Sequence, residues 1–278
     1  MDLTGFLYRT KAGRRLLPIL TDRRLSELCG AWLDSPFSGW LIPFFVRHNG
    51  IRLEEYDTRG MKSFNDCFSR KILPGLRPVD MNPDSLIAPC DGLLKAFRIR
   101  RDTVLNVKEA GYTLSSLLGS SRLAAHFEDG LCLVFRLRVD HYHRYCYVDS
   151  GVKSRNLFIP GCLHTVRPAA LEAYPVFTTN CREYALIRTE NFGTVVQMEV
   201  GAMLVGRICN HRQEGSVLRG EEKGFFQYGG STVIVLLQKG KALLDSGITE
   251  ASLSGRETPV KLGQKIGRSC QLSKQVVV

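Results

Sequence analysis

The chain has 278 residues, of which 44% are hydrophobic and 23% are charged, as is typical of a globular protein with a substantial core. Its net charge of +11 favours an anionic partner, which could be nucleic acid, an acidic membrane surface or an anionic substrate. The nine cysteines form no CxxC pair, and no apolar run approaches the roughly 20 residues that span a bilayer. Composition therefore argues against a disulfide framework and against an integral membrane protein.

The first seventy residues are predicted to be helical. Apolar residues between Leu25 and Trp32 recur at i, i+3, i+4 and i+7, and Phe37–Phe45 repeats this spacing despite Pro43. Residues 9–24 are strongly basic, with Asp22 as their one acidic side chain. Basic residues beside aromatic amphipathic segments are typical of helices at a membrane interface. The same faces could instead pack on the protein's own core, and periodicity alone favours the core.

From about Pro78 onward the pattern changes to strands. Apolar and polar residues alternate over Phe135–Val139 and over Val196–Val200, which indicates half-buried strands. Val233–Leu237 is uniformly apolar and predicts a fully buried strand. The expected fold is α+β in a single domain, 1–278, with a helical segment, 1–70, and a mostly-β core, 71–278.

Three segments carry candidate chemistry. Asp91 stands in a turn-forming context, His141 and His143 follow a predicted strand, and Ser231 follows the pair Gly229-Gly230. An Asp, a His and a Ser on different segments could form a nucleophile, a base and an orienting group. Taken singly, the Asp reads as a turn residue, the Ser as a hydroxyl at a strand start, and the histidines as satisfied polar groups at a sheet edge.

Seven blocks along nearly the whole chain, taken together and in order, resemble the phosphatidylserine decarboxylase family. A single block such as Gly-Ser-Thr is common, whereas seven in register are specific. The blocks are Ser63–Arg70 with Leu73–Pro78, Ala88–Gly92, Pro160–Val166, Asn180–Arg182, Val200–Gly206, Gly220–Thr232 and Glu257–Gly267.

The resemblance implies a self-processing enzyme. Ser231 would attack the Gly230 carbonyl, which adjacent glycines allow because their backbone tolerates strained geometry. Cleavage would give a heterodimer of a β chain, 1–230, and an α chain, 231–278, that begins with a pyruvoyl group made from Ser231. That ketone would form a Schiff base with phosphatidylserine and act as the electron sink for loss of CO₂, and the product would be phosphatidylethanolamine.

The resemblance makes Asp91 the orienting carboxylate and His143 a catalytic base, but the histidine motif departs from the family pattern. His141 replaces an Asp, and Cys146 stands where the self-cleavage histidine is usual. A thiol with a pKa near 8.5 is a poor base at neutral pH unless a cation lowers that pKa. Three alternatives follow: His143 serves both steps, His164 supplies the missing imidazole, or the chain is an inactive relative that does not process.

An enzyme that acts on an anionic phospholipid must reach a bilayer, so the resemblance favours membrane contact by Arg9–Arg24 and Phe37–Phe45. We therefore expect a peripheral protein on an anionic membrane surface, at its cytoplasmic face. One rival function is a pyruvoyl decarboxylase of a soluble amino acid. Another is a non-enzymatic basic protein that binds lipid or nucleic acid, although no nucleic-acid motif is visible. No metal site is expected.

Overall fold

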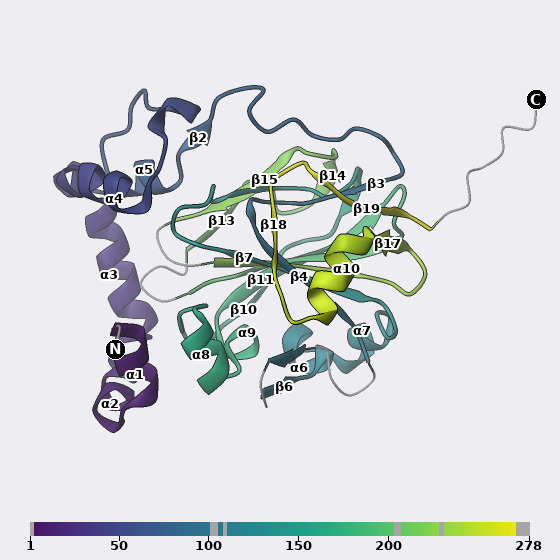
Figure 1. Cartoon of the computed structure of the whole chain (residues 1–278), viewed down its shortest axis with the longest axis horizontal. Coiled ribbons are helices and arrows are strands. Elements are labelled where there is room, and N and C mark those ends of the chain that lie inside the picture. The colour runs from purple at the N-terminus through teal and green to yellow at the C-terminus, as the bar shows by residue number, and fades with distance from the viewer. Residues whose placement is uncertain (1–2, 101–104, 108–109, 203–206, 228–230, 271–278) are drawn as a thin grey trace, which may run out of the picture.

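The structure, a computed structural model, describes residues 3–100, 105–107, 110–202, 207–227 and 231–270. Its N-terminal part is a column of helices at one side of the molecule (Figure 1). The side chains of Thr10 and Asp22 cap two of these helices, and Gly50 ends another with a positive φ of 62°. The helices are α1 (Leu3–Arg9), α2 (Lys11–Leu20), α3 (Arg23–Asp34), the 3₁₀ turn η1 (Pro36–Trp40), α4 (Leu41–Asn49), the 3₁₀ turn η2 (Leu53–Glu55) and α5 (Phe64–Phe68).

A nine-stranded antiparallel sheet forms the centre of the described core, in the order β14-β9-β11-β12-β16-β7-β4-β18, with β10 also paired to β11. Val233–Leu237 lies in β16 and is buried throughout, as its uniformly apolar sequence predicts. The strands are β4 (Gly92–Arg98), β7 (Leu131–Leu137), β9 (Gly151–Lys153), β10 (Leu157–Ile159), β11 (Arg182–Thr189), β12 (Thr194–Val200), β14 (Gly215–Val217), β16 (Ser231–Leu237) and β18 (Thr258–Val260).

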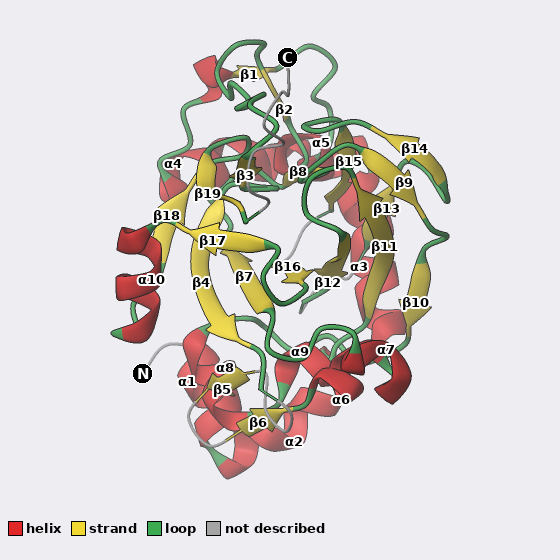
Figure 2. Ribbon diagram, turned by 90° about the vertical axis from the view of Figure 1, so that its right-hand side faces the viewer, coloured by secondary structure: helices red, strands yellow, loops and turns green. Residues whose placement is uncertain are grey.

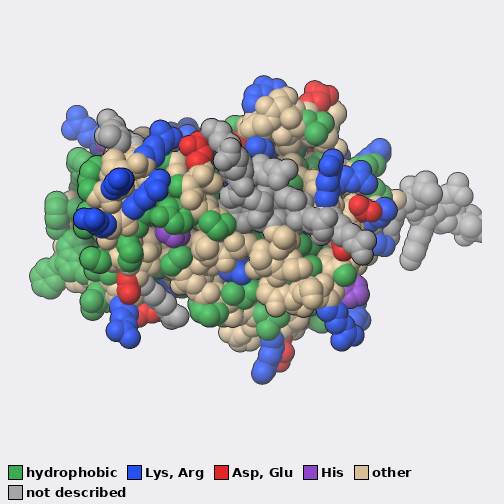
Figure 3. All heavy atoms as spheres, turned by 90° about the horizontal axis from the view of Figure 1, so that it is seen from below, with side chains coloured by type: hydrophobic (Ala, Val, Ile, Leu, Met, Phe, Trp, Pro, Cys, Tyr) green, Lys and Arg blue, Asp and Glu red, His purple; other side chains and the backbone are tan. Residues whose placement is uncertain are grey.

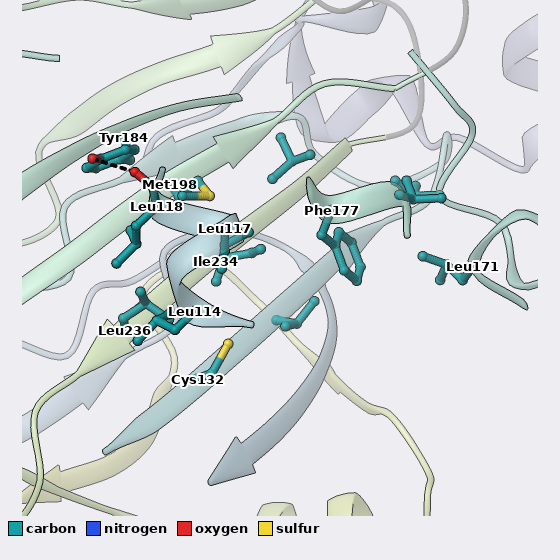
Figure 4. Close-up of a cluster of buried hydrophobic side chains, with 14 of the residues drawn as sticks. Leu114, Leu117, Leu118, Cys132, Leu171, Phe177, Tyr184, Met198, Ile234 and Leu236 are labelled. Carbon is teal, nitrogen blue, oxygen red and sulfur yellow. Dashed lines mark hydrogen bonds between the residues drawn. The ribbon is translucent and has the colours of Figure 1, made fainter. Parts of the chain in front are cut away.

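One face of this sheet is covered by helices. In the close-up of this cluster, Leu236 of β16 lies beside Leu114 and Ile234 beside Leu117 (Figure 4). Leu7, Tyr8 and Leu17 join the same cluster, so the first two helices dock on this side of the core. The covering helices are α6 (Leu114–Leu118), α7 (Ser121–Ala125), α8 (Pro168–Ala173) and α9 (Val176–Thr179).

Two three-stranded sheets and a helix cover the opposite face (Figure 2). This second layer buries Gln197 and Glu199 completely, so the half-buried strand predicted from Val196–Val200 is wrong: β12 is enclosed on both faces. The covering elements are β8 (Arg144–Cys146), β13 (Ile208–Asn210) and β15 (Glu222–Phe226), then β3 (Ser85–Ile87), β17 (Ala242–Leu244) and β19 (Lys265–Ser269), and α10 (Ser246–Leu253).

A third cluster joins the N-terminal helices to the core. Phe45, Phe64 and Phe68 pack in it with Tyr142, which lies between β7 and β8. Two short hairpins complete the described structure: β1 (Tyr56–Asp57) with β2 (Lys71–Ile72), and β5 (Leu105–Val107) with β6 (Ala110–Tyr112). The residues described thus form a mixed helix and sheet fold with a sheet-rich core, in which no helix has the length and apolar character needed to cross a bilayer.

Candidate active site

Ser231 is the first residue of β16 and lies at the same end of the sheet as Asp91. It pairs with Leu137 of β7, and the register of β4 against β7 places Gly92 on the other side of Leu137. On its opposite flank, Thr232 pairs with Val200, the last residue of β12. The Ser231 side chain is 1% exposed, and its Oγ has no hydrogen-bond partner among the described residues. A buried hydroxyl without a partner is rare unless it has a function.

Asp91 is held by an arginine that the sequence analysis did not single out. Arg77 donates from Nε to Oδ1 at 2.9 Å and from Nη2 to Oδ2 at 2.7 Å, and the Leu262 amide also donates to Oδ1 at 2.9 Å. Both side chains are only 9% exposed. Two parallel bonds of this kind fix the carboxylate in position. Arg77 does belong to the Leu73–Pro78 block, which was the one signal that could have identified it.

His143 is fully buried, and one nitrogen of its ring holds a free lone pair. Its Nδ1 lies 2.9 Å from the carbonyl oxygen of His141, and because a carbonyl only accepts, Nδ1 carries the hydrogen. Nε2 is then the atom with the lone pair, and it has no partner among the described residues. Burial lowers the pKa of His143 to about 3, with a further contribution from Arg70, so the ring is neutral. Its ring centroid lies 4.0 Å from that of Phe68, so α5 helps to enclose it.

The chain that leads to Ser231 passes next to His143. The Phe226 amide, at the end of β15, donates to the His143 carbonyl at 2.9 Å. The Ser231 side chain lies on the same side of β16 as Val233 and Val235, which pack against the layer that contains Phe226 and Tyr145. Ser231 and His143 therefore belong to two layers that pack on each other, and the segment that ends at Phe226 connects them along the chain.

His164 is placed differently. Its Nδ1 lies 3.1 Å from the hydroxyl oxygen of Tyr8, and its ring stacks on Tyr174 at 4.6 Å between centroids. The Asn180 side chain donates to the carbonyls of His164 and Gly201, at 2.7 Å each. Gly201 follows Val200, so the His164 backbone reaches the Ser231 end of the sheet while its ring is engaged by two tyrosines. Burial lowers the pKa of His164.

Cys146, which replaces the expected histidine, is a buried thiol in β8. Burial raises its pKa to about 12, whereas a resting base would need a lowered value. Its carbonyl accepts a hydrogen bond from Gln197 at 2.9 Å, and its amide donates to Pro89 at 2.8 Å. These contacts make Cys146 a packing residue that ties β8 to the loop before Asp91.

The ring of His141 is half-buried and lies near the carboxylates of Asp140 and Asp91. Burial lowers its pKa, Asp140 opposes that effect, and Asp91 opposes it more weakly. Arg70 donates to the carbonyls of Asp140 and His141 at 3.1 and 3.2 Å, which fixes the loop before His143. The Asp–His–Ser set of the sequence analysis is thus gathered at one end of the core, with Arg70 and Arg77 as added supports.

A cavity of 360 Å³ lies between α3 and the core, next to this end of the sheet. On the core side it is lined by Leu163 and Cys181, and the Cys181 carbonyl accepts from the Gly201 amide at 2.9 Å. Gln227, the last described residue before Ser231, also lines it. The remaining lining residues are mostly polar or small: Ser26, Glu27, Gly30, Ala31, Asp34, Phe158, Glu183, Arg207 and Ile208.

The helices beside this cavity expose apolar side chains on their outer surface. α3 turns its small and polar residues toward the cavity, while Leu28 and Trp32 are 71% and 46% exposed. Phe37, Trp40 and Phe44 extend the surface with exposures of 69–84%. Figure 3 shows hydrophobic side chains gathered at the end formed by the N-terminal helices, with Lys and Arg side chains beside them. An apolar face of this kind marks an interaction surface.

Comparison with known proteins gives one consistent answer. Residues 64–268 match the family model described as phosphatidylserine decarboxylase. The chain is 40% identical over 265 residues to phosphatidylserine decarboxylase proenzyme 2 of Clostridium acetobutylicum, covering 95% of this chain and 91% of that protein. It is 36% and 37% identical to the phosphatidylserine decarboxylase proenzymes of Clostridium botulinum (strain Alaska E43) and Clostridium perfringens (strain SM101), covering 94% of this chain and 90% of each relative.

Proposed function

The chain belongs to the phosphatidylserine decarboxylase family, and on that premise we propose that it decarboxylates phosphatidylserine to phosphatidylethanolamine after cutting itself at Gly230–Ser231. Gly230 lies outside the described residues, whereas Ser231 and the groups around it lie within them. The observation that carries the proposal is a pair of buried atoms without partners among the described residues, Ser231 Oγ and His143 Nε2, in two layers that pack on each other.

The residues fit the formation of a pyruvoyl group from Ser231. Its hydroxyl is buried at a strand start, and the layer packed on that strand leads into His143, a neutral imidazole with a free lone pair that could remove a proton during self-cleavage. A pyruvoyl group supplies an electron sink for the loss of CO₂. In each turnover His143 Nε2 would pass a proton drawn from solvent to the substrate carbon. Asp91, fixed by Arg77, holds a negative charge near the loop of His141 and His143.

His143 is preferred to His164 as the base because the two rings differ in what they already contact. The Tyr8 hydroxyl accepts from the Thr165 amide and donates to Nδ1 of His164, which leaves the hydrogen of that ring on Nε2, whereas His143 carries its hydrogen on Nδ1. We place His164 as a residue that positions the Asn180–Gly201 backbone beside Ser231. The His143 ring has no such partner for its Nε2 among the described residues.

The cavity behind α3 supports a lipid substrate rather than a soluble amino acid. Arg207 and Asp34, which lie 3.4 Å apart in an exposed ion pair, could exchange that contact for the phosphate and the ammonium of a serine headgroup, with Glu183 as a second carboxylate. The outer face of the same helix exposes Leu28 and Trp32, so a headgroup in the cavity would lie within one helix diameter of an apolar surface. We propose that this surface rests on an anionic membrane, with the protein peripheral and at the cytoplasmic face.

The first test is the intact mass and denaturing gel of the purified protein. The proposal expects two fragments, 1–230 and 231–278, with the smaller blocked at its N-terminus, and release of CO₂ from phosphatidylserine in vesicles. A single uncut chain without activity would make it an inactive relative. Activity on free serine with none on vesicles would support the soluble-substrate alternative.

The second test assigns the base. His143→Ala is expected to remain uncut, while His164→Ala and the exposed control His126→Ala are cut. Normal cutting of His143→Ala together with a block in His164→Ala would transfer the role to His164.

A further inference from the structure

A buried ion pair lies close to the proposed site and has no part in the steps above. Lys223 Nζ and Glu199 Oε2 are 2.5 Å apart, and both side chains are 0% exposed. Nζ also donates to Asn210 Oδ1 at 2.8 Å. A pair enclosed to this degree is seldom a net source of stability, because removing two charges from water costs about as much as their attraction returns. Its presence therefore calls for a functional explanation.

The fold has an irregularity that turns Lys223 inward. Glu222 pairs with Cys146, and Gly224 pairs with Tyr145, so Lys223 is an extra residue at a β-bulge between β15 and β8. Bulges of this kind redirect a side chain and are frequent beside active sites. The bulge directs the ammonium into the interlayer space, opposite the strand position at which the expected histidine is replaced by Cys146.

Glu199 lies on the same side of the sheet as Ser231. It pairs directly with Val233, and Ser231 is two residues before Val233, so Glu199 and Ser231 are diagonal neighbours. Diagonal neighbours in an antiparallel sheet are about 7–8 Å apart between Cα atoms, a gap that a long side chain spans. Glu199 Oε1 is buried without a partner among the described residues, as is Ser231 Oγ. The Glu199 carboxylate oxygen is an acceptor, and the Ser231 hydroxyl is a donor.

Two hydrogen bonds place the strand position of Cys146 close to both Asp91 and β12. The Cys146 amide donates to the carbonyl of Pro89, two residues before Asp91, at 2.8 Å. The side chain of Gln197, two residues before Glu199 and on the same face of β12, donates to the Cys146 carbonyl at 2.9 Å. The carboxylate stands within the same small region as the position of the missing histidine.

We propose that Glu199 accepts the hydroxyl proton of Ser231 in the first step of self-cleavage, and that Lys223 is a positioning residue that holds Glu199 for this task. The proton passes from Oγ to Glu199 as Oγ bonds to the Gly230 carbonyl carbon. As the carbon–nitrogen bond breaks, the same proton moves to the Ser231 nitrogen, which becomes an amine, and Glu199 is ionised again. His143 then removes the Ser231 α-proton, a Cα–Cβ double bond forms as the Cβ–Oγ bond breaks, and the Gly230 carboxylate leaves. The inference rests on the proposed cleavage at Gly230–Ser231.

The experiment follows cutting over time after cell-free synthesis of the full chain, with and without hydroxylamine, which cleaves an ester but not an amide. Glu199→Gln is expected to slow cutting about tenfold to a hundredfold, because a hydrogen bond to a charged acceptor is lost. Hydroxylamine should release no more fragments from it than form without hydroxylamine, because ester formation is then the slow step and the ester does not accumulate. It should release both fragments from His143→Ala, which is arrested after the ester. Glu190→Gln, an exposed carboxylate in the β11–β12 turn, is the matched control and should cut normally.

A double variant separates this role from a structural one. Glu199→Gln with Lys223→Met leaves no unpaired buried charge, so it should fold, as judged by thermal melting, and still cut slowly. Cutting at the wild-type rate by this folded double variant would overturn the inference, as would fragments from Glu199→Gln in excess of those formed without hydroxylamine. If the wild-type chain itself is never cut, the proposed function fails as well. If it is cut and Glu199→Gln is cut equally fast, only the inference fails.

Discussion

The burial of His143 makes the stability of the folded chain sensitive to acid in a defined range. Burial lowers the pKa of this imidazole from 6.5 to about 3. Between these two values the unfolded chain binds a proton that the folded chain excludes, so the free energy of unfolding falls as pH falls. The loss is about 1.4 kcal/mol for each pH unit below 6.5, or about 2 kcal/mol at pH 5. Above pH 6.5 both states are neutral at this residue, and the contribution is zero.

The assay is urea unfolding at pH 7.5 and pH 5.0, with Ser231→Ala as the parent so that every chain stays uncut. His143→Gln in that parent removes the titrating ring, and its loss of stability between the two pH values should be smaller than the parent's by about 2 kcal/mol. His126→Gln, at an exposed position, should lose as much as the parent does. Equal losses with and without His143 would refute the reasoning, because the ring would then be protonated in place and its Nε2 would not be a free, enclosed acceptor.

Three further predictions concern Asp91, the helical surface and the replaced histidine. Arg77→Met leaves Asp91 buried without its cation and should cost about 3–5 kcal/mol in urea unfolding; a cost below 1 kcal/mol would contradict the fixed pair. Replacing Phe37 and Trp40 together by Ser should weaken sedimentation with phosphatidylserine vesicles without lowering the melting temperature, since both side chains are exposed, and binding should also weaken with added salt. Cys146→Ser should cut at the wild-type rate, because a thiol with a pKa of about 12 is not the base, and a block would show that it is.

The sequence predicts the strands of the core better than their surroundings. Val233–Leu237 is apolar at every position, so burial on both faces follows from composition alone. Val196–Val200 alternates, and alternation indicates which residues share a face without indicating what covers that face. The second layer of β8 and β15 is built from distant segments, and it encloses Gln197 and Glu199. Their burial could be found only in three dimensions.

In the candidate site, too, the sequence identifies residue types but not the side chains that contact them. Asp91, His143 and Ser231 are identifiable as residue types in suggestive settings, and strand register brings two of their segments to one end of the sheet. The side chains that contact them come from other segments of the chain, and the tertiary fold decides which segments these are. Arg77 reaches Asp91 from a loop 14 residues earlier, and Phe68 of α5 closes over His143 from a helix that the sequence assigns to a separate N-terminal segment. Side-chain contacts across such separations leave no periodic signal.

The position of Cys146 allows one more test of the proposal that Glu199 takes the hydroxyl proton of Ser231 and His143 takes its α-proton. Cys146 pairs with Glu222 next to the bulge of Lys223, and its carbonyl accepts from Gln197, two residues before Glu199 on the same face of β12. If the carboxylate performs the task that a histidine at this strand position would perform, then Cys146→His should restore cutting to the slow Glu199→Gln/Lys223→Met variant. The larger ring strains a packed site at a cost of about 1–3 kcal/mol, so folding is checked by thermal melting. A folded triple variant that cuts no faster than the double variant would show that the two positions are not interchangeable, and the carboxylate would then act on Ser231 from a site of its own.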